Sequence, residues 1–443
     1  MIDNATTTAD ATTPADATTT AVRTTAVPAG YRLAELDDVA HRAQIIDVDR
    51  WGFAFEMAPE DEAVAVWDLE PGRTVGVWDE RGAEARLAAV HSSYAFAVPV
   101  PGGARLPAAG LTWVAVHPGH RRRGLARAML TAHLARTVGR GEALSVLYAA
   151  ETGIYGRYGY GVASQTATLT VGRGADLREV PGAADLVVEL DRLDPARHGA
   201  VIEQVHTAVV RPGWISRDTD ALRAAQLVDW PTARKEMEGL RVAVVRTPAG
   251  EPRAYAIFRR KGKWSDAGVP EGTVKVRESA ALDAPAARAL WGALTDLDLM
   301  AKVETAQLPL DDPLLHLLAD LRGASVRLSD DLWVRLLDVP RALAGRAYAA
   351  DVDVVLEVRD DLVPANAGHW HLRGGTAGAE VAATTAPAHL SLDVADLGSA
   401  YLGGTSLAAL AAAGRVQVLD GAALAPAATA FGWPVAPANG WGF

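Results

Sequence analysis

Residues 113–129, WVAVHPGHRRRGLARAM, constrain the local fold more tightly than any other part of the chain. The stretch opens with four residues that favour extended backbone, and Pro118 and Gly119 then interrupt the strand. Apolar residues recur at helical spacing from Leu125 to Met129. The stretch therefore predicts a β-strand, a tight turn and the start of an α-helix.

Such a junction is suited to binding a pyrophosphate. The first N–H groups of a helix have no intrahelical partner and point toward any anion placed there. Gly124 lets the backbone approach the phosphates closely, and the arginines at 121–123 can add charge-assisted hydrogen bonds. Neither a GxxxxGK[ST] loop nor a GxGxxG after a strand occurs. A basic surface turn before an ordinary helix is the alternative that composition leaves open.

Length and charge limit the architecture and the partners. A chain of 443 residues predicts two or three domains. The formal net charge of −11 argues against nucleic acid as a partner and favours cationic substrates, although it also suits a merely soluble protein. Cysteine is absent, which excludes a thiolate nucleophile and a cysteine-based metal site. No apolar run of about 18 residues and no signal peptide occur, so we predict a cytoplasmic protein without membrane contact.

The segments around the opening stretch predict a helix followed by antiparallel strands. Residues 1–29 are of low complexity and predict a disordered tail. A helical pattern begins near Val39, and strands are expected at 63–69, 74–79 and 88–98, followed by a loop at 99–110. After the helix at 124–138, residues 143–148 predict another strand. The middle third, at about 168–330, shows helix and strand patterns without a second phosphate-binding signature.

The loop at 149–161, AAETGIYGRYGYG, alternates glycines with Tyr155, Tyr158 and Tyr160. A tyrosine hydroxyl here can act as a general acid toward a departing thiolate in acyl transfer to an amine. A tyrosine that only hydrogen-bonds the backbone is the structural alternative. His369 and His371 share one face of a predicted strand, yet nothing nearby completes a ligand set, so no metal site is predicted.

Two motifs carry a resemblance to a known family. The order V-x-V-x-P-x-x-R-R-x-G-x-A after a strand resembles the acetyl-coenzyme A signature of the GCN5-related N-acetyltransferases. HPGHRRRGLARAM followed by ETGIYGRYGYG is similar to the Eis (enhanced intracellular survival) family of actinobacterial acetyltransferases, from about residue 30 to the C-terminus. The resemblance implies a tripartite α/β (α+β) fold: an acetyltransferase domain at 30–167, a second, cofactor-free one at 168–330, and a sterol-carrier-protein-like domain at 331–443. It also implies a homo-hexamer.

The resemblance also assigns site residues. It implies that the co-substrate acetyl-CoA is bound at three places. The strand contributes Val114, Ala115 and Val116, and the turn and helix start contribute Arg122, Arg123, Gly124, Leu125, Ala126 and Arg127. Near the thiol end of acetyl-CoA lie Ala150 and Glu151. It makes Tyr155 the general acid and the terminal carboxylate of Phe443 the general base. Gly442 departs from the family, which often has an acidic residue there. An unrelated chain would simply fray at this end.

The expected reaction transfers acetyl to primary amines of aminoglycoside-like or lysine-type substrates by direct attack. Asp49, Trp51 and Glu56 could supply the acidic and aromatic lining for such an amine, although charged residues near a helix end usually face water. The alternative is a non-catalytic acyl-CoA or lipid-binding module. Tyr155 together with a terminal Phe443 favours the enzyme, because a pure binder needs neither.

Overall fold

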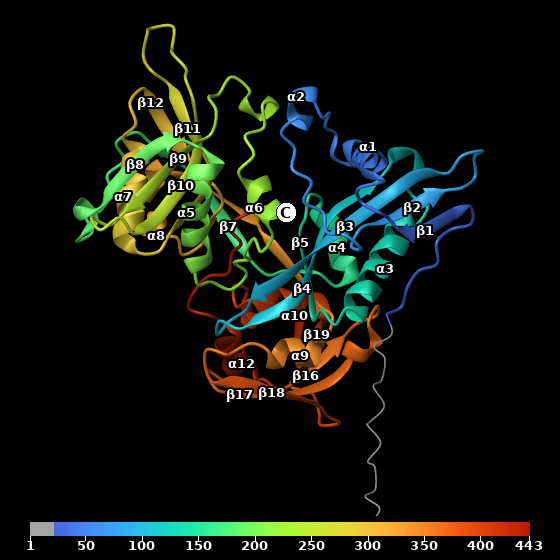
Figure 1. The fold of residues 1–443 in the computed structure, drawn as a ribbon. Helices are drawn as coiled ribbons and strands as arrows, with labels where there is room; N and C mark the ends of the chain where they lie inside the picture. Colours follow the sequence, from blue (N-terminus) through green and yellow to red (C-terminus); the bar gives the residue numbers. More distant parts are fainter. Residues whose placement is uncertain (1–21) are drawn as a thin grey trace, which may run out of the picture.

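The computed structural model describes residues 22–443. Two sheet-based parts diverge from a third below them, and the C-terminus lies between the first two (Figure 1). Residues 1–21 of the predicted tail lie outside the described residues. For residues 22–29 the prediction of disorder is wrong, because this segment is hydrogen-bonded to the folded parts. The Arg23 N–H donates to the Leu362 carbonyl at 2.8 Å, and the Thr25 N–H donates to Thr131 Oγ1 at 2.9 Å.

The first part is a seven-stranded sheet with the order β1-β2-β3-β4-β5-β15-β6. Its strands are β1 Tyr31–Glu35, β2 Val75–Asp79, β3 Arg86–Pro99, β4 Arg105–Val116, β5 Leu144–Tyr148, β15 Leu332–Leu336 and β6 Gly161–Val162. Neighbours are antiparallel except β4 and β5, which run parallel. Two helices, α1 Arg42–Phe53 and α3 Leu125–Gly139, pack on this sheet.

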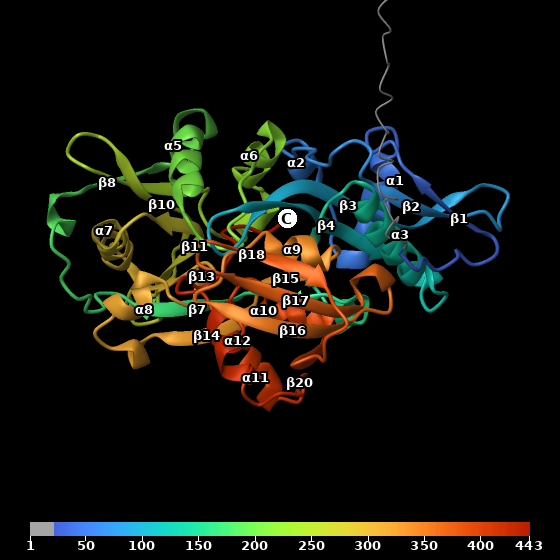
Figure 2. The same ribbon diagram turned by 90° about the horizontal axis from the view of Figure 1, so that it is seen from below.

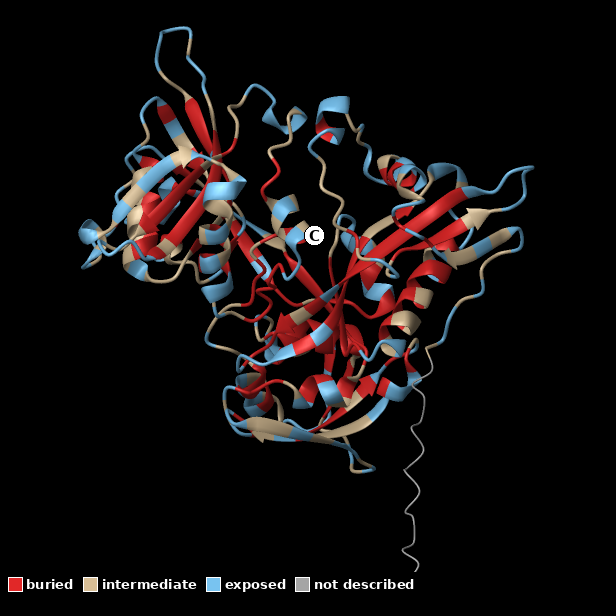
Figure 3. Cartoon of the chain, viewed as in Figure 1, coloured by how far each residue is buried: buried red, intermediate tan, exposed pale blue. Residues whose placement is uncertain are grey.

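The alternation of side chains along β4 explains the two covered faces. Ala115 packs with Ile45 and Val48 of α1, while Val114 and Val116 pack with Met129 and the α3 core. Successive side chains of a strand point to opposite faces, so the two helices cover opposite sides of the sheet. Figure 3 shows the resulting buried interior between exposed outer surfaces.

Two local predictions in this part are wrong. Residues 63–69 form no strand; a short helix, α2 Pro59–Glu62, precedes an extended loop whose Trp67 indole N–H donates to Asp38 at 2.7 Å. This apolar run has no neighbouring strand to pair with, so it forms no β-ladder. The predicted loop at 99–110 is also too long, because β4 begins at Arg105 and pairs with β3.

The chain crosses between the first two parts at two adjacent points. Ser164 separates β6 from β7 (Gln165–Gly172), and Asp331 separates β14 (Ser325–Asp330) from β15. At this crossing the Ser164 hydroxyl donates to Asp331 at 2.7 Å, and the Asp331 N–H donates to the Ser164 carbonyl at 3.1 Å. The first sheet is therefore completed by β15, a strand that the sequence placed in the third domain.

The second part is an eight-stranded sheet with the order β13-β7-β12-β11-β10-β9-β8, in which β14 also pairs with β7. The further strands are β8 Val187–Arg192, β9 Arg241–Arg246, β10 Pro252–Lys261, β11 Gly272–Ala281, β12 Met300–Glu304 and β13 Leu308–Pro309. The helices α5 Pro195–Ala208 and α7 Ala284–Thr295 contribute to separate apolar cores, while α6 Asp220–Gln226 and α8 Pro313–Leu317 lie beside them.

The third part is a five-stranded sheet with the order β18-β17-β16-β19-β20. Its elements are α9 Val339–Ala344, β16 Val352–Arg359, β17 Gly368–Gly375, β18 Gly378–Ala383, β19 Leu390–Asp393, α10 Val394–Tyr401, α11 Leu407–Ala412, β20 Val416–Val418 and α12 Leu424–Phe431. One apolar core joins this part to the first sheet (Figure 2). Gly161 allows the contact, because a Cβ there would overlap the Ala395 carbonyl of α10.

No helix between residues 22 and 443 combines the length and the hydropathy that a membrane-spanning segment needs. His369 Nδ1 donates to the Ala386 carbonyl at 2.8 Å, and His371 pairs with Asp353 at 2.6 Å. Both histidines therefore have partners within their own sheet region.

Candidate active site

The first sheet opens between β4 and β5. These strands pair only from Ala108 opposite Leu144 to Gly110 opposite Val146, yet β4 continues to Val116. A bulge bends β4 beyond this point, where Trp113 adopts a left-handed backbone with φ of 54°. On the side facing β5, the backbone from residue 111 to 116 has no strand partner. Val114, Ala115 and Val116 thus lie on an open strand edge, and their binding of an extended ligand stays a prediction.

A cavity of about 420 Å³ lies at this opening. It contains four residues predicted for the site, namely Val114, Ala150, Tyr155 and Phe443. The sequence analysis did not find the other lining residues, which are Phe53, Leu111, Thr112, Trp113, Tyr148, Ala149, Gln307, Ser329, Asp330 and Asp331. Segments from three separated regions of the chain therefore meet in one cavity.

The start of α3 is built to accept an anion. Gly124 is its N-cap with φ of 83°, no side chain caps the helix, and its first turn contains no acidic residue. A Cβ at Gly124 would meet no atom within 4 Å, so the approach to the backbone is open. Leu125 is buried at 1% exposure, so only its backbone N–H can serve a ligand, while Ala126 is half-buried.

The arginines beside this helix start are available for the same ligand. Arg121, Arg122 and Arg123 are exposed, and no carboxylate among residues 22–443 forms an ion pair with them. Arg127 is exposed and donates to the Thr25 hydroxyl at 3.3 Å. These free cations and the uncapped helix are an arrangement that favours a pyrophosphate over a plain basic turn.

Tyr155 lies at the end of α4 (Thr152–Tyr155), which Glu151 precedes as N-cap. Burial, and then the negative charge of Glu151, raise the pKa of Tyr155 to about 12. Its hydroxyl has no hydrogen-bond partner among residues 22–443, whereas the Tyr160 hydroxyl is bonded to Ser145 at 2.8 Å. Of these two tyrosines, Tyr155 has the protonated and unengaged hydroxyl that a general acid requires at neutral pH.

The partly buried ring of Phe443 packs against the apolar core. Its ring centroid lies 4.8 Å from that of Phe96, 5.2 Å from Tyr148 and 5.7 Å from Trp441. Gly110 leaves room for the Phe96 ring on which Phe443 packs, because a Cβ there would overlap that ring and would come within 3.2 Å of the Phe443 ring. The chain end is therefore an ordered wall of the cavity and not a frayed terminus.

Tyr148 and Asp331 are site residues that the sequence analysis missed. The Tyr148 hydroxyl donates to the Trp441 carbonyl at 2.9 Å, and Asp331 accepts the Asn439 N–H at 3.0 Å. Burial raises the pKa of Asp331. Tyr148 could have been found as the last residue of the strand that leads into the aromatic loop. Asp331 had no such signal, because only the crossing between the sheets brings it to the cavity.

The predicted amine-binding residues are not brought together. Asp49 is a buried residue of α1, and desolvation raises its pKa to about 7. Trp51 is 56% exposed with its ring 5.0 Å from that of His117, and Glu56 is exposed. None of the three lines the cavity, and the residue of α1 that does line it is Phe53. Their role in binding an amine stays a prediction.

The corresponding helix of the second sheet differs at its start. β11 and β12 run parallel as β4 and β5 do, and α7 follows β11. The Asp283 side chain caps α7 by accepting the Ala286 N–H at 2.8 Å, and it pairs with Arg253. A carboxylate thus occupies the position that a phosphate would take at Gly124, which supports the prediction of a cofactor-free second domain.

Comparison with known proteins is consistent with this geometry. Sequence models described as acetyltransferase (GNAT) domains match residues 31–163 and 213–336, and a sterol carrier protein domain matches residues 339–439. An uncharacterized N-acetyltransferase of Streptomyces avermitilis is 40% identical over 86% of this chain and 92% of its own. The N-acetyltransferase Eis of Mycobacterium tuberculosis is 35% identical over 72% of this chain and 77% of its own.

The crystal structure of Eis1 from Mycobacterium abscessus superposes with a TM-score of 0.77 at 31% identity, covering 93% of this chain and 100% of the other. The predicted tripartite fold, two acetyltransferase-like parts and a sterol-carrier-protein-like part, is confirmed. The chain therefore belongs to the Eis family of GCN5-related N-acetyltransferases.

Proposed function

We propose that this N-acetyltransferase transfers acetyl from acetyl-CoA to primary amines of aminoglycoside-like or lysine-type substrates by direct attack. The observation that carries the proposal is the cavity at the β4–β5 opening, which both Tyr155 and the terminal residue Phe443 line. Acetyl-CoA would lie with its pyrophosphate at the α3 start and its pantetheine along the free edge of β4. The homo-hexamer stays a prediction from the family resemblance, and the cytoplasmic location stays a prediction from the sequence.

In this mechanism the chain supplies one base and one acid. The Phe443 carboxylate orients the substrate ammonium and receives its proton, which then passes to water because a terminal carboxylate has a low pKa. The free amine forms the N–C bond to the acetyl carbon as the C–S bond breaks, and the nitrogen then loses a second proton through the same carboxylate to water, which leaves the neutral amide. Tyr155 donates its proton to the departing sulfur and regains one from water.

The charge of the cavity supports an amine as the acceptor. Its ionisable lining side chains other than tyrosine are Asp330 and Asp331, the terminal residue Phe443 also lines it, and no lysine, arginine or histidine among residues 22–443 does. Phe53 and Trp113 add aromatic faces on which a cation or a sugar ring can stack. An anionic acceptor would meet repulsion here, whereas an ammonium group is attracted.

Release of free coenzyme A thiol from acetyl-CoA, measured with a panel of aminoglycosides, polyamines and Nα-blocked lysine, tests the proposed reaction. We expect release only when an amine is present, and mass spectrometry should show one acetyl group added for each thiol released. Binding of acetyl-CoA or fatty acid without turnover on any amine would instead favour the non-catalytic binding module.

Replacement of Arg122 by alanine should raise KM for acetyl-CoA by about tenfold or more, because it removes a charge-assisted contact to a phosphate. We expect kcat to change by less than about twofold, since Arg122 lies at the phosphate end and not at the acetyl group. Steady-state kinetics with varied acetyl-CoA measures both constants. Arg173→Ala, which removes an exposed arginine paired with Asp298 in the second sheet, is the charge-matched control. A larger fall in kcat than rise in KM would contradict this assignment.

A further inference from the structure

The last residues of the chain are held by the second sheet part and not by the third, from which they emerge. After α12 the chain runs back to the gap between the first two parts (Figure 1). The Ala438 N–H donates to the Pro212 carbonyl at 3.1 Å, and Asn439 Oδ1 accepts the Ile215 N–H at 3.0 Å. The Trp441 indole N–H donates to the Ile215 carbonyl at 2.8 Å. Residues 212–215 therefore form a docking edge for the chain end.

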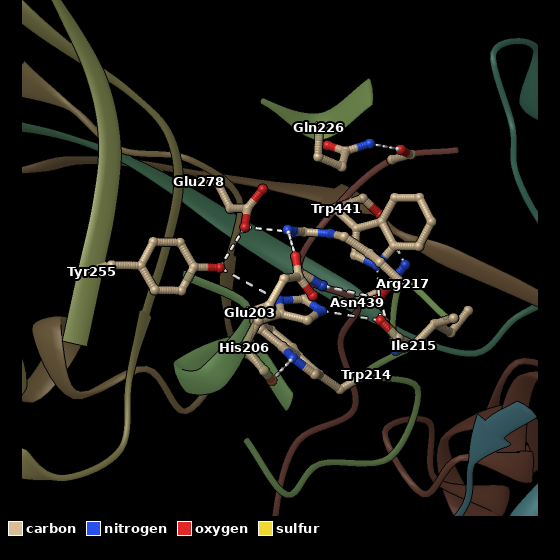
Figure 4. A network of polar contacts seen from close by, with 12 residues as sticks. Glu203, His206, Trp214, Ile215, Arg217, Gln226, Tyr255, Glu278, Asn439 and Trp441 are labelled. Atoms are coloured by element: carbon tan, nitrogen blue, oxygen red, sulfur yellow. Dashed lines mark hydrogen bonds and ion pairs between the residues drawn. The ribbon is translucent and has the colours of Figure 1, made fainter. Parts of the chain in front are cut away.

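A buried ion-pair cluster lies directly beneath Trp441 (Figure 4). Arg217 is 1% exposed and pairs with Glu203 at 2.8 Å and with Glu278 at 2.5 Å. Its guanidinium carbon lies 5.5 Å from the centroid of the Trp441 ring. Tyr255 donates a further hydrogen bond to Glu278. Because both carboxylates bind the planar guanidinium of Arg217, they fix its orientation, and the face of the guanidinium can pack against the Trp441 indole.

The other side of the chain end belongs to the first sheet. The Trp441 carbonyl accepts two hydrogen bonds, from the Tyr148 hydroxyl at 2.9 Å and from the Asn439 side-chain amide at 2.8 Å. Gly442 contributes only a carbonyl contact to Gln226 at 3.3 Å, and a Cβ on it would meet nothing within 4 Å. The place of the terminal carboxylate therefore depends on two anchors, the Trp441 indole and the Phe443 ring.

We propose that Arg217 and Trp441 are positioning residues, through which the second sheet part holds the terminal carboxylate in the catalytic cavity. This inference rests on the proposed role of that carboxylate as base. It gives the second acetyltransferase-like domain a task in the reaction, although it contributes only Gln307, Ser329 and Asp330 to the cavity lining. Loss of the anchor would let the carboxylate move relative to the amine while leaving the acetyl-CoA contacts of β4 and α3 in place.

The first test is Trp441→Phe, which keeps an aromatic ring but removes the hydrogen bond to Ile215 and part of the contact with Arg217. We expect kcat to fall by about tenfold, as small displacements of a reacting group do, with KM for acetyl-CoA unchanged within about twofold. Trp264→Phe, at a 58% exposed site in the second sheet part, is the matched control and should leave both constants unchanged. An unaltered kcat in Trp441→Phe would overturn the proposal.

The second test repeats Trp441→Phe in a protein extended by one alanine after Phe443, where the carboxylate is already displaced. If Trp441 acts by positioning that group, the substitution should lower kcat no further in this background. An equal fall in both backgrounds would show that Trp441 acts in another way and would overturn the proposal. Full activity of the extended protein would instead reject the carboxylate as base, so the two failures are distinguishable.

Arg217→Lys provides a variant that keeps the buried charge balanced. The lysine ammonium can still neutralise Glu203 and Glu278 but has no planar face for the indole. We expect its kcat to fall while its KM for acetyl-CoA stays unchanged, again with no further fall in the extended protein. Equal losses in both backgrounds would count against Arg217 as a positioning residue. Thermal unfolding of each variant identifies any that fails to fold.

Discussion

Addition of a single alanine after Phe443 should lower kcat for amine acetylation by about 10²- to 10⁴-fold, the usual contribution of a general base. The Phe443 carboxylate becomes a neutral amide, and the new carboxylate lies up to about 3.5 Å further along the chain. The Phe443 ring is anchored against Phe96 and Tyr148, so the chain cannot readily slide back to restore the original position.

The extension should leave the fold and acetyl-CoA binding unchanged, because neither the α3 start nor the edge of β4 touches the added residue. Calorimetric binding of acetyl-CoA and the thermal midpoint provide these controls. The carboxylate acts only on the acceptor amine, from which it takes a proton. The fall in kcat should therefore appear with every amine acceptor. An extended protein with normal kcat would remove the chain end from the mechanism.

Replacement of Tyr155 by phenylalanine is expected to lower kcat by about 10²-fold while acetyl-CoA binds as before. The substitution removes only a hydroxyl that has no hydrogen-bond partner among residues 22–443, so the packing of the 7% exposed ring is preserved. Because the pKa of Tyr155 is raised to about 12, its hydroxyl stays protonated through neutral and mildly alkaline pH. The rate should therefore show no decline from this group below about pH 10.

Tyr158→Phe is the matched control for this substitution. Tyr158 belongs to the same loop and is 6% exposed, but it does not line the cavity. Its variant should retain kcat within about twofold. Equal rates for Tyr155→Phe and the unchanged protein, measured as thiol release at saturating acetyl-CoA, would exclude Tyr155 as the acid.

The regions that were predicted well are those whose signals are local. The glycine and arginines at the start of α3 and the spacing of apolar residues along the helix depend only on neighbouring residues. β5 and the aromatic loop that contains Tyr155 were found for the same reason. The strand predicted at 63–69 was wrong because a short apolar run forms a strand only when a neighbouring strand is available to pair with it.

The sequence by itself determined the glycine turn at the start of α3, the tyrosine loop and, through its motifs, the family. Only the tertiary structure decided that β15 completes the first sheet, that Asp331 reaches the cavity at the crossing, and that the second sheet part holds the chain end through Arg217 and Trp441. These contacts join residues more than a hundred positions apart. No local preference encodes such pairs, since they arise from the packing of whole sheets against one another.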